Sequence, residues 1–168
     1  ILHSILKLLF VFYGYIATEE GTLIYNQRLA YEGFLPFVDY DAWNSILNDY
    51  LIGWYQFFLT PTILIQRLFG WLISLGVFWL TIKLATTFFS RVVVVLTALF
   101  LTFGSFYYLY LSTIPYSEQT MTLFILASLL LLRQNSMRKK PSLLLSIIGC
   151  LLFVLSVWIR IQALPATV

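Results

Sequence analysis

Five apolar segments dominate the sequence and constrain the fold more than any other feature. A helix needs about 20 apolar residues to cross the hydrocarbon layer of a membrane, because it rises about 1.5 Å per residue. Segments that reach or approach this length occupy residues 1–17, 68–85, 92–111, 120–132 and 142–159. With 61% hydrophobic and only 10% charged residues, a soluble domain of this length has too little interior to cover such a surface. The sequence predicts an all-α, polytopic integral membrane helical bundle.

A long loop, residues 18–65, separates the first two segments and is rich in aromatic residues. Tyr and Trp favour the membrane interface, but such rings also stack on sugars or flank lipid tails. Within this loop, residues 50–65 are apolar but too short to cross. We expect them to form an interfacial helix, capped by Asn48 or Asp49 and ended by Pro61.

Charge is distributed unevenly between the two predicted sides of the membrane. Seven of the ten basic residues fall on one side, if the two lysines inside segments extend toward it: Lys7, Lys83, Arg91, Arg133, Arg138, Lys139 and Lys140. The positive-inside rule makes this side cytoplasmic. All seven acids then face outward, in the long loop or at Glu118, which suggests a site there.

Composition also excludes several classes of function. A net charge of +3 without a basic stripe argues against nucleic acid as a partner. One cysteine, Cys150, and one histidine, His3, leave no disulfide framework, multi-histidine metal site or histidine-dependent triad. Because the chain begins at Ile1 and ends just after an apolar segment, we expect residues 1–168 to be one transmembrane domain of a longer protein.

Two pairs of acids lie in the long loop. Glu19 and Glu20 follow the first segment directly, where they suit the first turn of a helix, general base chemistry or a divalent cation. Asp39 and Asp41 follow a turn marked by Gly33 and Pro36, and they serve either that turn or a substrate.

Three arginines are predicted on the same outer side. Arg28 lies in the long loop, Arg67 opens the second segment and Arg160 ends the fifth. A guanidinium pairs bidentately with phosphate oxygens, so each is a candidate phosphate ligand. Each also suits contact with lipid headgroups.

An ordered set of motifs carries a resemblance to a known superfamily. TEEGTLIYN (18–26) follows the first segment, YEGFLPFVD (31–39) lies in the loop, QRLFGWLISL (66–75) opens the second segment, and IPYSE (114–118) precedes the fourth. In this order they resemble GT-C superfamily membrane glycosyltransferases, in the branch of protein mannosyltransferase-like and aminoarabinose transferase-like enzymes. No single motif is specific; the ordered set is more so.

The resemblance implies an enzyme that transfers a sugar from a polyprenyl-phosphate donor to a lipid, glycan or protein acceptor outside the cytoplasm, in the plasma membrane. The family usually has Asp then Glu after its first span, so Glu19 takes the Asp position and Glu20 the Glu position. We expect one of the two to be the base of an inverting displacement. Asp39, Asp41, Arg28, Arg67, Glu118 and Arg160 are the candidate substrate ligands. No cofactor is demanded, and Glu19, Glu20 and Asp39 are the candidate ligands of a divalent metal.

The alternative hypothesis is a multi-span transporter or lipid flippase without covalent chemistry. Ionisable residues inside the membrane usually mark a transport path. The predicted segments contain few, because Lys7 and Lys83 are expected to extend to the cytoplasmic side. The sequence therefore favours the glycosyltransferase.

Overall fold

The structure, a computed structural model, describes residues 2–12, 17–36, 38–41, 46–54, 58–59, 62–103 and 117–161. Regular structure within these ranges is helical, apart from an isolated bridge between Pro36 and Tyr40. The helices are α1 (Leu2–Val11), α2 (Ala17–Glu32), α3 (Ile46–Gly53), α4 (Ile63–Phe88), α5 (Arg91–Phe103), α7 (Ser117–Ser136) and α8 (Leu143–Ile161). The predicted all-α class is confirmed for the described part of the chain.

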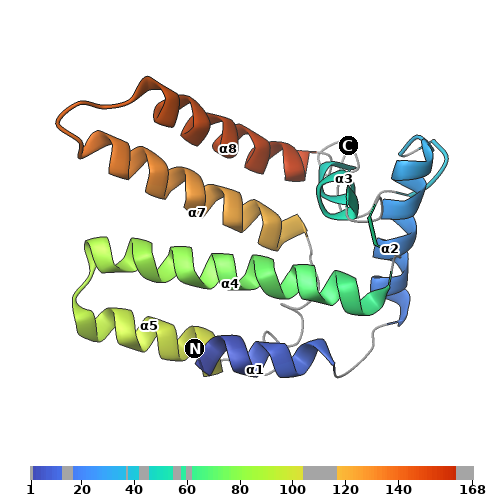
Figure 1. The fold of residues 1–168 in the computed structure, drawn as a ribbon, viewed down its shortest axis with the longest axis horizontal. Helices are drawn as coiled ribbons and strands as arrows, with labels where there is room; N and C mark the ends of the chain where they lie inside the picture. Colours follow the sequence, from blue (N-terminus) through green and yellow to red (C-terminus); the bar gives the residue numbers. More distant parts are fainter. Residues whose placement is uncertain are drawn as a thin grey trace.

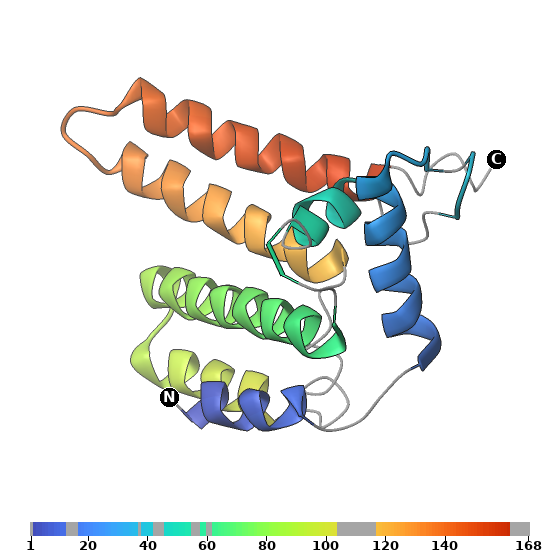
Figure 2. The same cartoon turned by 45° about the vertical axis from the view of Figure 1, so that its right-hand side comes forward.

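The apolar helices lie side by side, and α2 crosses one end of the row. Figures 1 and 2 show α5, α4, α7 and α8 in succession, with α3 beside α2 at the end where α4 begins. Helix α1 runs antiparallel to α4, because Val11 contacts Arg67 while Ser4, nearer the chain start, accepts a bond from Trp71. The start of α4, the end of α1 and both loop helices therefore meet at one end.

Helices α7 and α8 form the most extensive pair. The Ser128 hydroxyl donates to the Gly149 carbonyl at 2.8 Å, and a Cβ on Gly149 would lie 2.8 Å from Leu132. Such close approach of small residues is how helices associate in an apolar medium. Asn135 then closes the connection between them, because its side chain bonds both the N–H and the carbonyl of Ser142.

Length and apolar character single out one helix as able to cross a membrane. Among the described residues only α4, with 26 residues, meets both criteria, whereas residues 91–103 and 143–159 are apolar but shorter. Helix α4 contains the predicted segment 68–85 and begins after its N-cap Thr62. The polytopic arrangement therefore stays a prediction.

Two predicted boundaries require correction. Residues 1–17 do not form one helix, because α1 ends at Val11 and Ala17 already belongs to α2, which runs in another direction (Figure 2). The interfacial helix predicted over 50–65 is also wrong: α3 ends at Gly53 and α4 begins at Ile63. Asp49 lies inside α3 and is no cap. Hydropathy records how apolar a segment is, not where its backbone turns.

The first turn of a helix at Glu19 and Glu20 was one of the predicted interpretations, and α2 continues that turn over 16 residues to Glu32. It buries Glu20, Leu23, Gln27 and Ala30, which recur every three or four residues on one face. Tyr40 returns from the following turn to pack against Leu29 and Ala30. Because polar residues occupy half of this face, its pattern does not stand out as amphipathic in the sequence.

Candidate functional site

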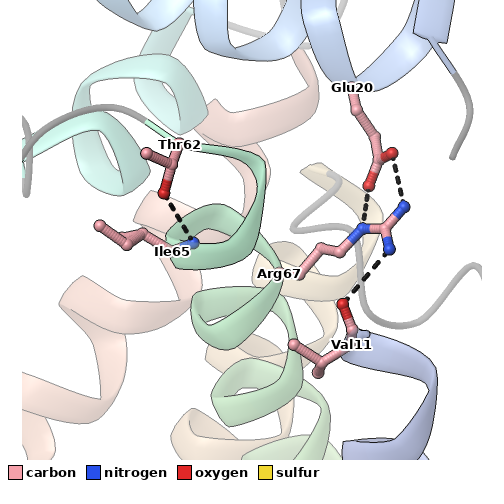
Figure 3. Close-up of polar contacts among 5 residues, drawn as sticks. All are labelled: Val11, Glu20, Thr62, Ile65 and Arg67. Atoms are coloured by element: carbon pink, nitrogen blue, oxygen red, sulfur yellow. Dashed lines mark hydrogen bonds and ion pairs between the residues drawn. The ribbon is translucent and has the colours of Figure 1, made fainter. Parts of the chain in front are cut away.

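A buried ion pair joins three helices at the end of the row. Two guanidinium nitrogens of Arg67, Nε and Nη2, donate to the two carboxylate oxygens of Glu20 at 2.5 and 2.7 Å. Its Nη1 donates to the carbonyl of Val11 at 3.3 Å (Figure 3). Glu20 is 1% exposed and Arg67 is 4% exposed. The pair thus fixes the first turn of α2 against the end of α1 and the start of α4.

The local sequence explains why Arg67 reaches this position. Thr62 accepts a hydrogen bond from the N–H of Ile65 and so defines where α4 begins (Figure 3). Arg67 then falls in the second turn, where its side chain points back toward the helix start. Val11 is the last residue of α1, so its carbonyl has no partner within the helix and can accept a hydrogen bond from Arg67.

The electrostatics of this pair depend on complete pairing. Burying a charge is costly unless it is paired and hydrogen-bonded, and the fork of Arg67 matches both oxygens of Glu20. Removing one partner of such a pair typically costs about 3–5 kcal/mol. Glu20 therefore holds the local geometry, whatever else it does.

Glu19 shares the first turn of α2 with Glu20, but its side chain lies outside the described residues. The same holds for the side chain of Arg160, whose backbone belongs to the last turns of α8. Their predicted roles as base and phosphate ligand remain predictions.

Asp39 and Asp41 lie in the exposed turn that follows α2. Gly33, with φ of 90°, ends the helix in the left-handed region, where a side chain would be strained. The Asp39 carboxylate accepts the N–H of Leu35 at 2.7 Å, and the Asp41 carbonyl accepts the Asn26 side chain at 2.8 Å. The carboxylate of Asp39 therefore stabilises the turn, as one of its two predicted interpretations holds, whereas Asp41 contributes its main-chain carbonyl.

Arg28 and Glu118 each contact a residue of their own helix. Arg28 forms an exposed ion pair with Glu32, one turn further along α2, at 2.6 Å. Glu118 accepts a bond from Ser117 at 3.3 Å in the first turn of α7 and lines a cavity. Among the described side chains, the predicted arginine that contacts Glu19 or Glu20 is Arg67, which binds Glu20.

The metal hypothesis has limited support in the described part of the chain. Within those ranges no three His, Cys, Asp or Glu side chains gather into a metal site. Of the proposed ligands, Glu20 is engaged with Arg67 and Asp39 with its own turn. The Glu19 side chain is not described, so a divalent cation stays a prediction.

Asp49 is a buried acid that sequence analysis took only for a helix cap. Neither carboxylate oxygen has a hydrogen-bond partner among the described residues, and the residue is 0% exposed. Burial raises the pKa of Asp49 to about 7. Burial, and then the charges of Asp49 and Tyr50, raise the pKa of the Tyr40 phenol as well. The apolar residues on both sides of Asn48 and Asp49 were the signal for this burial.

The second omission is a polar face on α1. His3 and Lys7 are buried one turn apart, while Leu2, Ile5 and Leu9 are exposed. The Lys7 ammonium donates to the Ser74 hydroxyl on α4. Lys7 is therefore held against α4 and is not exposed at a helix end, and its predicted cytoplasmic side stays a prediction. The i, i+4 spacing of two polar residues in an apolar helix was a usable signal, because it places both on one face.

Comparisons with protein families, with curated proteins and with solved structures find no match to this chain.

Proposed function

We propose that the chain belongs to a membrane glycosyltransferase of the GT-C type, which transfers a sugar from a polyprenyl-phosphate donor to an acceptor on the non-cytoplasmic side. The buried Glu20–Arg67 pair carries this proposal. An acid and an arginine, both candidates on chemical grounds, come together where α1, α2 and α4 meet. The pair holds the first turn of α2, and with it the backbone of Glu19, against the start of α4.

The membrane arrangement forms part of the proposal. The five apolar helices cross the membrane in turn, and the end that carries α2 and α3 faces outward. Helix α4 has the length for this, and Arg133 reaches the Thr87 carbonyl at the opposite, basic end. The phosphate of a lipid donor lies at headgroup depth, so its reaction belongs at such a helix end.

In the proposed reaction, a carboxylate removes the proton from the acceptor hydroxyl. The acceptor oxygen forms a bond to the anomeric carbon, and the bond from that carbon to the phosphate oxygen breaks. The phosphate leaves with the electron pair, and the configuration inverts. If Glu20 took up the proton, its ion pair with Arg67 would be lost. We therefore assign the role of base to Glu19 and a positioning role to Glu20. Arg67, Arg28 and Arg160 remain the candidates for stabilising the leaving phosphate.

The experiment is a transfer assay with the full-length protein and a polyprenyl-phosphate sugar. Glu19→Gln should abolish transfer while the protein stays folded. Gln134→Ala, at an exposed residue of α7 outside the proposed site, is the control and should leave transfer unchanged. Undiminished transfer by Glu19→Gln, Glu20→Gln and Asp39→Asn would remove the proposed site.

A specific observation favours a second function, transport of a polar solute. Lys7 and His3 are buried against α4 and α5, and they line a cavity. Ionisable residues inside a membrane commonly mark substrate and ion pathways. Solute uptake by proteoliposomes, without any transfer product, would favour this function over the first.

A further inference from the structure

An open, largely apolar groove of about 560 Å³ lies between α4 and α7, at the end of α4 away from the Glu20–Arg67 pair. Its walls come from the last turns of the two helices: Leu84 and Phe88 from α4, and Leu129, Leu132, Arg133 and Ser136 from α7. Phe88 is 62% exposed and Leu129 is 44% exposed, so the helices leave these apolar walls uncovered. The volume falls within the range of about 300–1,000 Å³ that is typical of sites for small organic ligands. The groove therefore suits an apolar chain better than a polar solute.

Arg133 is the charged residue of this groove, and two contacts with α4 hold its guanidinium in place. Its Nη2 donates to the Thr87 carbonyl at 3.3 Å, and its Cζ lies 4.1 Å from the centroid of the Phe88 ring, in a cation–π arrangement. No carboxylate forms an ion pair with Arg133 among the described residues. A guanidinium carries five N–H donors, so donors remain for the oxygens of a phosphate. The groove thus combines apolar walls with one oriented donor group for an anion.

Further basic residues gather at the same end of the molecule. Arg91 begins α5, and residues 138–140, an arginine and two lysines, follow α7; all four are exposed. Figure 1 shows both connections, from α4 to α5 and from α7 to α8, at this end of the row. Apart from Glu118, which lies in the first turn of α7 at the opposite end, residues 50–168 contain no acid. The other acids lie within residues 19–49, around α2 and α3 (Figure 1). This end therefore carries positive charge that the chain's own acids do not balance.

An anionic lipid is the occupant that fits both properties. A free phosphate ion would leave the apolar walls in contact with water, and a zwitterionic lipid would not balance the charge. Basic pockets between transmembrane helices commonly hold anionic headgroups. We propose that this groove binds an anionic phospholipid, with an acyl chain along the walls from α4 and α7 and its phosphate on Arg133. This lipid site requires the membrane arrangement proposed above but not the transfer reaction, because it lies at the other end of α4 from the first turn of α2.

Lipid retention by the full-length protein in detergent tests this site. Phosphatidylglycerol and phosphatidylcholine with the same acyl chains are added to separate samples, and native mass spectrometry measures the fraction of protein that keeps a lipid. The unsubstituted protein should retain phosphatidylglycerol in preference to phosphatidylcholine. Arg133→Gln should lower this preference about fivefold. Lys83→Gln is the matched control and should keep the preference, because Lys83 is an exposed lysine of α4 that contacts Trp79 and does not line the groove.

A second pair of variants tests the groove without changing its charge. Leu129→Trp should fill the groove and lower the retention of phosphatidylglycerol several-fold while Arg133 stays in place. Leu144→Trp, at an exposed leucine of α8 outside the groove, is the matched control and should leave retention unchanged. The substituted side chains are all at least partly exposed, so each variant should remain folded.

Several results would overturn the proposal. Equal retention of the two phospholipids, or retention of neither, would do so, as would retention by Arg133→Gln and Leu129→Trp that matches their controls. Displacement of phosphatidylglycerol by an equal concentration of inorganic phosphate would show a simple anion site instead. Preferred retention of a polyprenyl phosphate would assign the groove to a donor lipid. Retention requires neither sugar donor nor acceptor, so its failure and the failure of the transfer assay are separate results.

Discussion

The carboxylate of Glu20 and the guanidinium of Arg67, 47 residues apart in the chain, form a bidentate pair that is almost fully buried. The ends of two helices meet at this pair: α1 ends with its last carbonyl on Arg67, and Glu20 lies in the first turn of α2. This relationship allows a direct test of how the three helices are joined.

Breaking the pair on one side should destabilise the fold strongly. Arg67→Met removes the partner of the buried Glu20 carboxylate, and Glu20→Gln removes the partner of the buried Arg67 guanidinium. Each substitution should therefore lower the free energy of unfolding by about 3–5 kcal/mol. The double variant Glu20→Gln with Arg67→Met should lose less than the sum of the two. Thermal unfolding of the purified protein in detergent measures this. Additive losses in the double variant would mean that the two side chains act independently.

Gly53 and Gly21 should respond in opposite ways to the same substitution. A Cβ on Gly53 would lie 2.8 Å from the Tyr31 ring and 3.0 Å from Gln27, whereas a Cβ on Gly21 meets nothing within 4 Å. Gly53→Ala should therefore cost about 1–3 kcal/mol through overpacking between α2 and α3. Gly21→Ala should gain about 0.5–1 kcal/mol of helix stability. Equal midpoints of thermal unfolding for the two variants would contradict this packing.

Asp49 should make the protein less stable as the pH rises. Because burial raises its pKa from 3.8 to about 7, the folded state binds a proton that the unfolded state has lost between these values. The contribution of Asp49 to stability should be greatest below about pH 4, fall through the interval and level off above pH 7. Asp49→Asn should remove this part of the pH dependence and raise stability at pH 8.

The matched control for Asp49 is Asp39→Asn, at an exposed acid in the turn after α2. Unfolding midpoints measured from pH 5 to pH 8 for the three proteins make the comparison. If Asp49→Asn follows the same pH curve as the unsubstituted protein, the buried carboxylate is not the titrating group.

Asn135 should be essential to the hairpin of α7 and α8. Its side chain donates to the Ser142 carbonyl and the Ser146 hydroxyl at 2.8 Å and accepts the Ser142 N–H at 2.7 Å. Asn135→Ala should cost on the order of 1–3 kcal/mol, because a buried N–H and a carbonyl lose their partner. Gln134→Ala, at the exposed neighbour, should change the unfolding midpoint little. Protease cleavage near residue 140 offers a second measurement of the opened hairpin.

Hydropathy predicted the apolar helices better than the polar ones. Helix α8 begins and ends within two residues of its predicted bounds, and α4 and α7 extend beyond theirs because their polar ends remain helical. The full length of α2 could not be anticipated, because its buried face includes Glu20 and Gln27 and so lacks a clear apolar period. Its stability depends on partners outside its own sequence.

Chemistry alone selected Glu20 and Arg67 as candidates but did not pair them. Each residue was chosen for the charge that it could offer a substrate. Their contact depends instead on where the first turns of α4 lie relative to α2. The burial of Lys7, His3 and Asp49 was missed although the i, i+4 spacing of the first two and the apolar neighbours of Asp49 indicated it. A polar residue in an apolar helix is exposed or buried according to its neighbours, which single-sequence reasoning does not supply.

The bond from Lys7 to Ser74 spans 67 residues and carries a consequence for biosynthesis. Ribosomes add about 5 to 20 residues per second, so α1 emerges roughly 3 to 13 seconds before its partner on α4 has been synthesised. Throughout that interval a nascent helix bearing a cation has no native neighbour to shield it. Until Ser74 has been synthesised, the Lys7 ammonium must stay in water or bind another partner.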